Sequence, residues 1–315
     1  MTALFSLATR LLVLTLLSVS TLHAAKPLNI QAIDNAGQSH PGFLMKADAT
    51  GLVIAATENG GSSITLPYAQ IQSLNVEEPR GWTQAQTALD AGNYPEAKIA
   101  FDKLANEYID LLPWKDGYGS LARLNYFKAL KGLNQLTELA AAMDRQLAQP
   151  LVLSDYYQAD FNDLKGWAIL GKDDILALEA FLLEFQEDVQ SRESLLPLFK
   201  PAPARLIASL HYLRAMFELK QQKPDLALID FQSAMTYDFG SDPAIFGMSL
   251  KESLAIVATK LQTKPDDLTL KRLAHSLAVT YRDIVGGGTV PEPYVAYLPP
   301  VTDPAAAKEE EKEEK

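Results

Sequence analysis

The feature that most constrains the fold is a long stretch, from Arg80 to about Val285, in which apolar residues recur at spacings of three and four. This is the period of an amphipathic α-helix, and no strand-like alternation interrupts it. Glycine and proline lie mainly between the periodic segments, where they end one helix and precede the next. The stretch therefore predicts a mainly α region, residues 80–285, containing about ten helices.

Several breaks between these helices have an identifiable cause. Gly92 and Asn93 end the first helix, and Gly171 separates two later ones. Pro224 follows Lys223 in the first turn of its helix, where no backbone hydrogen bond is lost. Because the connections are short, consecutive helices are expected to pack as antiparallel neighbours. The expected helices begin near residues 81, 94, 118, 134, 154, 173, 203, 224, 243 and 265.

The segment GNYPEA at residues 92–97, followed by Phe101, resembles the middle of a tetratricopeptide repeat (TPR). In such a repeat, glycine turns the chain and alanine lets two helices approach closely. Related pairs recur at Leu139 and Met143, at Ala177 and Phe181, and at Ala227 and Phe231. From Ala97 onward, the first members of these pairs are 42, 38 and 50 residues apart, whereas the family repeat is 34 residues long. The resemblance implies a degenerate, TPR-like α-solenoid of antiparallel helix pairs, with other helical arrays as the alternative.

The resemblance also implies a concave groove, lined by the first helix of each pair, that holds extended peptides or partner helices. Projection from Ala97 and Ala227 predicts the protein-binding groove residues Trp82, Gln86, Asp90, Tyr212, Met216 and Lys220. Outside this groove, Trp114 and Tyr118 belong to the predicted loop LLPWKDGYG. Bulky aromatic side chains in such a loop either pin it to the core or anchor a partner.

Residues 26–79 have a different pattern, with short runs rich in Ile, Val, Leu and Thr separated by turn-forming Asp, Asn and Gly. Five strands are expected, at residues 28–33, 42–47, 52–57, 63–68 and 71–76. A long meander, a short turn at residues 67–70 and a last strand resemble the SH3-like and Sm-like small barrels. We therefore expect a small five-stranded β-barrel that acts as a structural or docking module.

Residues 1–25 have the layout of a secretory signal peptide. Arg10 precedes an apolar run from Leu11 to Leu22, and small alanines follow. This run of twelve residues is shorter than the roughly 20 that cross a bilayer as a helix. We therefore expect cleavage and no stable transmembrane anchor, with a retained anchor as the alternative. The absence of cysteine favours a bacterial periplasm or envelope over a disulfide-bonded secreted domain.

The charge balance argues against a nucleic-acid partner. The chain has 28 Lys and Arg residues against 39 Asp and Glu, a formal net charge of −11, whereas nucleic acids are held by clustered basic charge. A local exception lies between Lys200 and Lys223, where five basic residues accompany only one acidic residue, Glu218. This stretch either steers an acidic partner or forms a solvated helix face.

Residues 286–315 contain five prolines, a triple glycine and a terminal run of Lys and Glu. This composition buries too little apolar surface to offset the loss of chain entropy, so a disordered, Pro-rich acidic tail is expected. Tyr294, Tyr297 and Leu298 offer an extended docking motif as the alternative.

The sequence contains no catalytic or metal-binding motif. His40, His211 and His275 follow the signal segment, and none has a metal-ligand spacing. Acidic pairs at residues 173–174 and 266–267 precede expected helices, where carboxylates cap free backbone N–H groups. We therefore expect no catalytic residue, no metal and no cofactor.

These observations favour an exported, non-catalytic protein–protein interaction scaffold of the bacterial envelope, whose partners are other envelope or periplasmic proteins. The alternative is a periplasmic peptide-binding or envelope-polymer-binding component, or an enzyme, with its site between barrel and solenoid. A deep pocket lined by converging titratable groups with shifted pKa values would favour that alternative.

Overall fold

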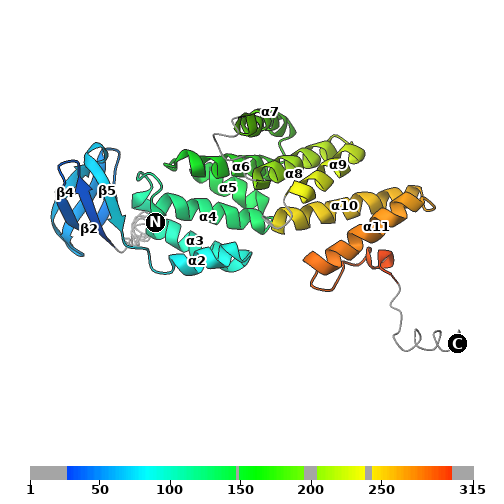
Figure 1. The fold of residues 1–315 in the computed structure, drawn as a ribbon, viewed down its shortest axis with the longest axis horizontal. Coiled ribbons are helices and arrows are strands. Elements are labelled where there is room, and N and C mark those ends of the chain that lie inside the picture. The colour runs from blue at the N-terminus through cyan, green and yellow to red at the C-terminus, as the bar shows by residue number, and fades with distance from the viewer. Residues whose placement is uncertain (1–26, 147–148, 195–203, 238–242, 300–315) are drawn as a thin grey trace, which may run out of the picture.

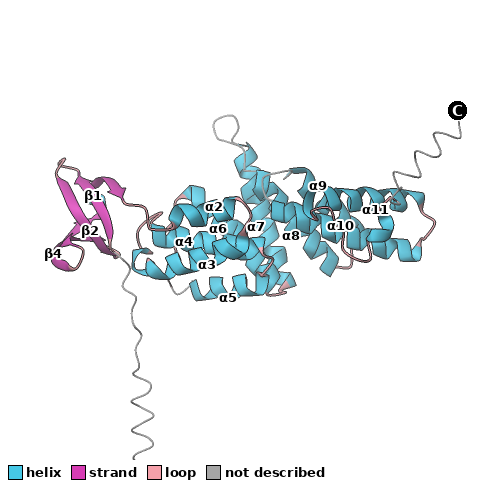
Figure 2. Ribbon diagram, turned by 90° about the horizontal axis from the view of Figure 1, so that it is seen from below, coloured by secondary structure: helices cyan, strands magenta, loops and turns pink. Residues whose placement is uncertain are grey.

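The computed structural model describes residues 27–146, 149–194, 204–237 and 243–299. The predicted signal segment and the last part of the predicted tail lie outside these ranges. The described chain is mainly helical: an antiparallel five-stranded sheet is followed by ten α-helices. These elements form an elongated molecule with the sheet at one end and α11 at the other (Figures 1 and 2).

The sheet has the strand order β4-β3-β2-β1-β5, so the first strand pairs with both the second and the last. Its strands are β1 (Leu28–Asp34), β2 (Ser39–Ala47), β3 (Gly51–Thr57), β4 (Gly60–Pro67) and β5 (Ile71–Val76). A 3-10 turn, η1 (Tyr68–Gln70), connects β4 to β5 at the position where a short turn is expected. The five strand predictions are confirmed. The two edge strands, β4 and β5, are not paired with each other.

Alternation and turn chemistry explain this sheet. In β1, Leu28, Ile30 and Ala32 are buried while the residues between them are exposed, as a half-buried strand requires. The β1–β2 turn is held by the Asp34 carboxylate, which accepts hydrogen bonds from the backbone N–H groups of Ala36 and Gln38 at 2.9 Å. Local hydrogen bonds of this kind are the reason aspartate favours turns.

The helices begin within three residues of their predicted positions. They are α2 (Trp82–Asp90), α3 (Tyr94–Glu107), α4 (Tyr118–Gly132), α5 (Leu136–Gln146), α6 (Asp155–Gly171), α7 (Ile175–Ser194), α8 (Ala204–Lys220), α9 (Pro224–Tyr237), α10 (Pro243–Thr263) and α11 (Leu268–Thr280). The expected capping is also present. Asp174 accepts from the Ala177 N–H at 3.0 Å, and Asp267 accepts from the N–H groups of Thr269 and Leu270.

Four helix hairpins share one turn geometry. In α2–α3, α4–α5, α6–α7 and α8–α9 the connection contains one residue with a left-handed backbone: Gly92 (φ 74°), Asn134 (φ 54°), Asp173 (φ 59°) and Gln222 (φ 58°). In each turn this residue's N–H donates to the carbonyl three residues earlier, at 2.9–3.1 Å. Glycine adopts this conformation most easily, and it stands at only the first of the four turns. The four hairpins therefore repeat the same backbone geometry, although the residue at the turn differs between them.

The helices pack in chain order, each against the next, and α4, α6, α8 and α10 also contact one another in succession. One hydrophobic core runs from the sheet through these helices to α10. A second, smaller cluster lies between α10 and α11. Because α4, α6 and α8 contact one another in succession, these first helices of three hairpins form a continuous layer.

The beginning of the predicted disordered tail, residues 286–299, instead packs against the last helices. Tyr294, Tyr297 and Leu298 lie against the cluster between α10 and α11, and His275 Nδ1 is 2.9 Å from the carbonyl oxygen of Tyr297. The apolar side chains among these prolines therefore dock onto the protein's own helices. Composition alone favoured a solvated tail because it does not reveal an apolar surface elsewhere in the fold.

Candidate functional site

Residues of α2, α4 and α6 line a polar pocket of about 270 Å³. Asp90 and Gln86 come from α2, Lys128 and Lys131 from α4, and Asp160 and Asp163 from α6. Its remaining described lining residues are Leu89, Gly92, Tyr94, Gly132, Leu164 and Pro243. Pro243 begins α10, so this pocket combines the first helices of three hairpins with a helix far along the chain.

The α2 wall is held by amide hydrogen bonds. Gln86 Nε2 donates to the Asp90 carboxylate at 2.8 Å, which the i, i+4 spacing on one helix face permits. Asn125 Nδ2, on α4, donates to Gln86 Oε1 at 3.1 Å. These contacts fix the Gln86 amide and orient the Asp90 carboxylate at the pocket, while the Asp90 residue as a whole stays exposed.

The α4 and α6 walls are joined by two ion pairs. Lys128 Nζ lies 2.6 Å from Asp160, and Lys131 Nζ lies 3.0 Å from Asp163. The Lys131 and Asp163 side chains are only 9% and 8% exposed, so this second pair is buried. Lysines three residues apart on α4 thus face carboxylates three residues apart on α6, which places both pairs on facing helix surfaces.

The buried pair continues into α8. Trp167 Nε1 donates to Asp163 at 3.2 Å and to the Ser209 hydroxyl at 2.6 Å, and Ser209 donates to Asp163. The Lys131 ammonium also lies 4.8 Å from the centre of the Trp167 ring, in cation–π range. We call the set Lys128, Lys131, Asp160, Asp163, Trp167 and Ser209 the polar ladder. It links the first helices of the second, third and fourth hairpins.

Two of the six predicted groove residues, Gln86 and Asp90, line this pocket. Trp82 lies on the same helix but is partly buried in an aromatic group, with its ring centre 5.5 Å from Phe101 and 4.9 Å from Tyr118. Trp82 thus contributes mainly to the packing of α2 against α3 and α4.

The predicted residues on α8 lie elsewhere. Tyr212 is 3% exposed and stacks on Trp167 at 4.8 Å, so it is a core residue and presents no surface to a groove. Burial raises its pKa far above the usual range. Met216 packs against the same core, and Lys220 forms an ion pair with Asp173 at the α6–α7 turn. Tyr212 therefore cannot line a groove, because α8 turns this side chain toward α6 and α9, whereas Met216 and Lys220 stay partly exposed.

The predicted loop anchors pack inward. Trp114 and Tyr118 are partly buried against the core, with ring centres 6.2 Å apart. Gly117 is required beneath them, because a Cβ there would lie 2.7 Å from the Trp114 ring. This geometry matches the first expected role of these aromatic residues, which is to pin the loop to the core, and not the second, which is to anchor a partner.

A second cleft, of about 590 Å³, lies between the sheet and the helical region. Lys46, Ala47 and Ala49 line it from the β2 side, and Ile109, Leu112 and Val152 from loops of the helical region. Ile109 and Val152 are each 38% exposed. The wall is mainly apolar, and no histidine lies among its described lining residues.

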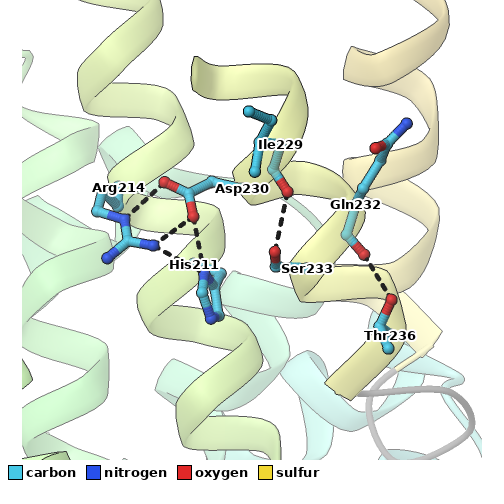
Figure 3. A network of polar contacts seen from close by, with 7 residues as sticks. All are labelled: His211, Arg214, Ile229, Asp230, Gln232, Ser233 and Thr236. Carbon is cyan, nitrogen blue, oxygen red and sulfur yellow. Dashed lines mark hydrogen bonds and ion pairs between the residues drawn. The ribbon is translucent and has the colours of Figure 1, made fainter. Parts of the chain in front are cut away.

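The basic stretch that ends at Lys223 is partly neutralised. Arg214 Nε donates to Asp230 at 2.6 Å, and His211 Nδ1 lies 2.8 Å from the same carboxylate (Figure 3). Burial raises the pKa of Asp230, but the hydrogen bonds from Arg214 and His211 outweigh it and hold this pKa below its usual range. With Lys220 held by Asp173, two of the five basic side chains already have acidic partners.

Among the described residues, no group of three or more His, Cys, Asp or Glu side chains is placed to hold a metal ion. Within the same ranges, every helix is too short or too polar to cross a membrane.

Comparisons with known proteins give no relative. No protein-family model matches the chain, no curated protein is significantly similar in sequence, and no solved structure is significantly similar in fold.

Proposed function

We propose that this protein is an exported, non-catalytic interaction scaffold that binds a segment of a partner protein across α2, α4 and α6. The observation that carries the proposal is the polar pocket in which Gln86 and Asp90 meet the polar ladder. Hydrogen bonds and ion pairs hold its polar side chains in place before any partner arrives, and such preorganisation lowers the entropic cost of binding.

The proposed architecture is a TPR-like solenoid. It is supported by the shared turn geometry of the four hairpins and by the succession of contacts between first helices. The small residues Ala85, Ala97, Ala215 and Ala227 lie on α2, α3, α8 and α9, and all four are fully buried, as close approach of paired helices requires. Stacked helix pairs of this kind present long surfaces suited to extended partners.

For the N-terminal sheet we propose an SH3-like or Sm-like module. The pairing of β1 with β5 and the 3-10 turn before β5 support it, while the lack of pairing between β4 and β5 leaves the sheet open. For the chain as a whole we propose a cleaved signal peptide and a periplasmic or envelope location. The proposed partners are envelope proteins and not nucleic acids, in keeping with the net charge of −11.

The test is crosslinking of the intact cell envelope around the tagged full-length chain, followed by mass spectrometry. The variant Gln86→Ala/Asp90→Ala alters the pocket, and Glu179→Ala/Glu184→Ala alters the exposed face of α7 as a matched control. The proposal expects one or a few envelope proteins that disappear with the pocket variant and persist with the control. Equal recovery with all three chains would contradict it.

The cleft between sheet and helices favours a second candidate, a binding site for a small or peptidic envelope component. Its volume lies within the range of small-molecule sites, and its walls are mainly apolar, as in most such sites. Ile109→Asp would place a charge in this wall. If the second candidate is right, partners or ligands are lost with Ile109→Asp and retained with the Gln86→Ala/Asp90→Ala variant.

A further inference from the structure

The charge of the polar pocket indicates the chemistry of its occupant. Five charged side chains line it, and its two lysines are each matched by a carboxylate, Lys128 by Asp160 and Lys131 by Asp163. Asp90 is the additional carboxylate, and it accepts a hydrogen bond from the neutral Gln86 amide. The described lining of the pocket therefore carries a net negative charge.

The position of Asp90 is unfavourable for its own helix. It is the last residue of α2, and a carboxylate at a helix C-terminus opposes the helix dipole, which favours cations there. The residue is exposed, so it contributes nothing to the core that would offset this cost. The Asp90 carboxylate, oriented at the pocket by the Gln86 amide, is suited to pair with a cation from a partner.

The surroundings reinforce the same preference. The protein has a net charge of −11, which attracts cationic segments from a distance. Leu89, which is partly exposed, lines the pocket beside the charged groups and offers apolar contact for the aliphatic stem of a long basic side chain. The volume of about 270 Å³ is small, so the pocket suits one side chain of a partner and not a folded element.

We infer that this pocket receives a lysine or arginine side chain from an extended segment of the partner protein, with its charged end at the Asp90 carboxylate. The inference rests on the proposed function and adds the chemistry of the segment that the groove selects. A long basic side chain satisfies both the carboxylate and the apolar wall. An acidic segment meets an unfavourable charge at the same position.

The test uses a phage-displayed library of random peptides selected on the purified full-length chain. The peptides that bind are synthesised, and their dissociation constants are measured by fluorescence anisotropy for the wild type, Asp90→Asn and the matched control Glu179→Gln on α7. Both changes remove one exposed carboxylate, but only Asp90 lines the pocket. Each peptide is also made with norleucine in place of its basic residue.

The inference expects selected peptides to share a lysine or arginine whose replacement weakens binding. Asp90→Asn should weaken binding by about tenfold or more, the range for a hydrogen bond to a charged group, while Glu179→Gln leaves it unchanged. The norleucine peptide should lose little further affinity in the Asp90→Asn variant, because both changes remove the same contact.

Two failures are distinguishable. In the first failure, Gln86→Ala weakens binding of the peptides, but the peptides share no basic residue or bind Asp90→Asn as well as the wild type. This result would overturn the inference and leave the proposed groove in place. A library that yields no peptide sensitive to any pocket substitution would contradict the proposed function and this inference together.

Discussion

The substitution Asp163→Ala tests whether the polar ladder holds the layer of first helices together. In the wild type the Asp163 carboxylate accepts from Lys131 on α4, from Trp167 on its own helix and from Ser209 on α8. The change leaves the Lys131 ammonium, which is 9% exposed, without this carboxylate. Breaking a buried ion pair by removing one partner costs about 3–5 kcal/mol of unfolding free energy.

That loss is large compared with the stability of a typical domain, about 5–15 kcal/mol. A matched control is Asp144→Ala, which breaks the ion pair with Lys172 on the surface, where the two side chains are 52% and 44% exposed. An exposed pair of this kind contributes about 0–1 kcal/mol. The comparison separates the effect of burial from the effect of removing an aspartate.

The assay is urea unfolding followed by circular dichroism, with both variants and the wild type at pH 7. A third variant, Lys131→Met/Asp163→Leu, replaces the pair with apolar side chains and should lose less stability than Asp163→Ala, because it removes the buried ammonium together with its carboxylate. The reasoning would be refuted if Asp163→Ala lost no more stability than Asp144→Ala, or if the double variant were the least stable.

Three further predictions concern stability and self-association. Burial raises the pKa of Glu252, so the folded state favours the protonated form of this side chain. Glu252→Gln should therefore raise the urea midpoint at pH 7. This gain should vanish below about pH 4.5, where the glutamate is protonated in both the folded and the unfolded state. Gly119→Ala should cost about 1–3 kcal/mol in thermal unfolding, because its Cβ would overlap the Tyr108 carbonyl oxygen, whereas Gly247→Ala, with ordinary contact to Val285, should cost far less. Truncation after Val285 should expose the apolar α10–α11 surface and cause self-association in analytical ultracentrifugation, whereas truncation after Pro299 should not.

The order and limits of the elements are predictable from the sequence because they depend on local periodicity and on glycine, proline and aspartate at the ends. The α2–α3 hairpin is the clearest case, since Gly92 supplies the left-handed turn directly. The other three hairpins use Asn134, Asp173 and Gln222 at the same position. Asparagine and aspartate tolerate this conformation, but nothing in their sequence context distinguishes them from ordinary polar residues.

The polar ladder was not predicted, because it depends on which surfaces of the helices pack against each other. The relevant signal is the spacing: Lys128 and Lys131 on one helix match Asp160 and Asp163 on another, three residues apart in each pair. Such a match indicates a contact only once the two helices are known to be neighbours. Gln86 and Asp90 are predicted as groove residues from α2, the helix that follows the repeat pattern best. Both line the pocket, and their role in binding a protein stays a prediction.

Tyr212 shows the opposite case. A tyrosine on the expected inner face of α8 suits a binding groove as well as it suits a core, since its ring is apolar and its hydroxyl polar. In the fold the ring stacks on Trp167 and lies edge-on to Phe231 at 5.4 Å. Only the relative rotation of α6, α8 and α9 decides between the two roles, and that rotation is a property of packing rather than of local sequence.

The measurement that tests the central claim most directly is site-specific photocrosslinking in the intact envelope. A photoreactive benzoylphenylalanine replaces Ala91, an exposed residue beside the polar pocket, Ile109 in the cleft beside the sheet, or Leu183 on the exposed face of α7. Position 91 leaves the Asp90 carboxylate in place. A partner that lies along α2, α4 and α6 should give a discrete adduct from position 91 and none from position 183. A discrete adduct from position 109 with none from position 91 would contradict the account and assign binding to the cleft between sheet and helices.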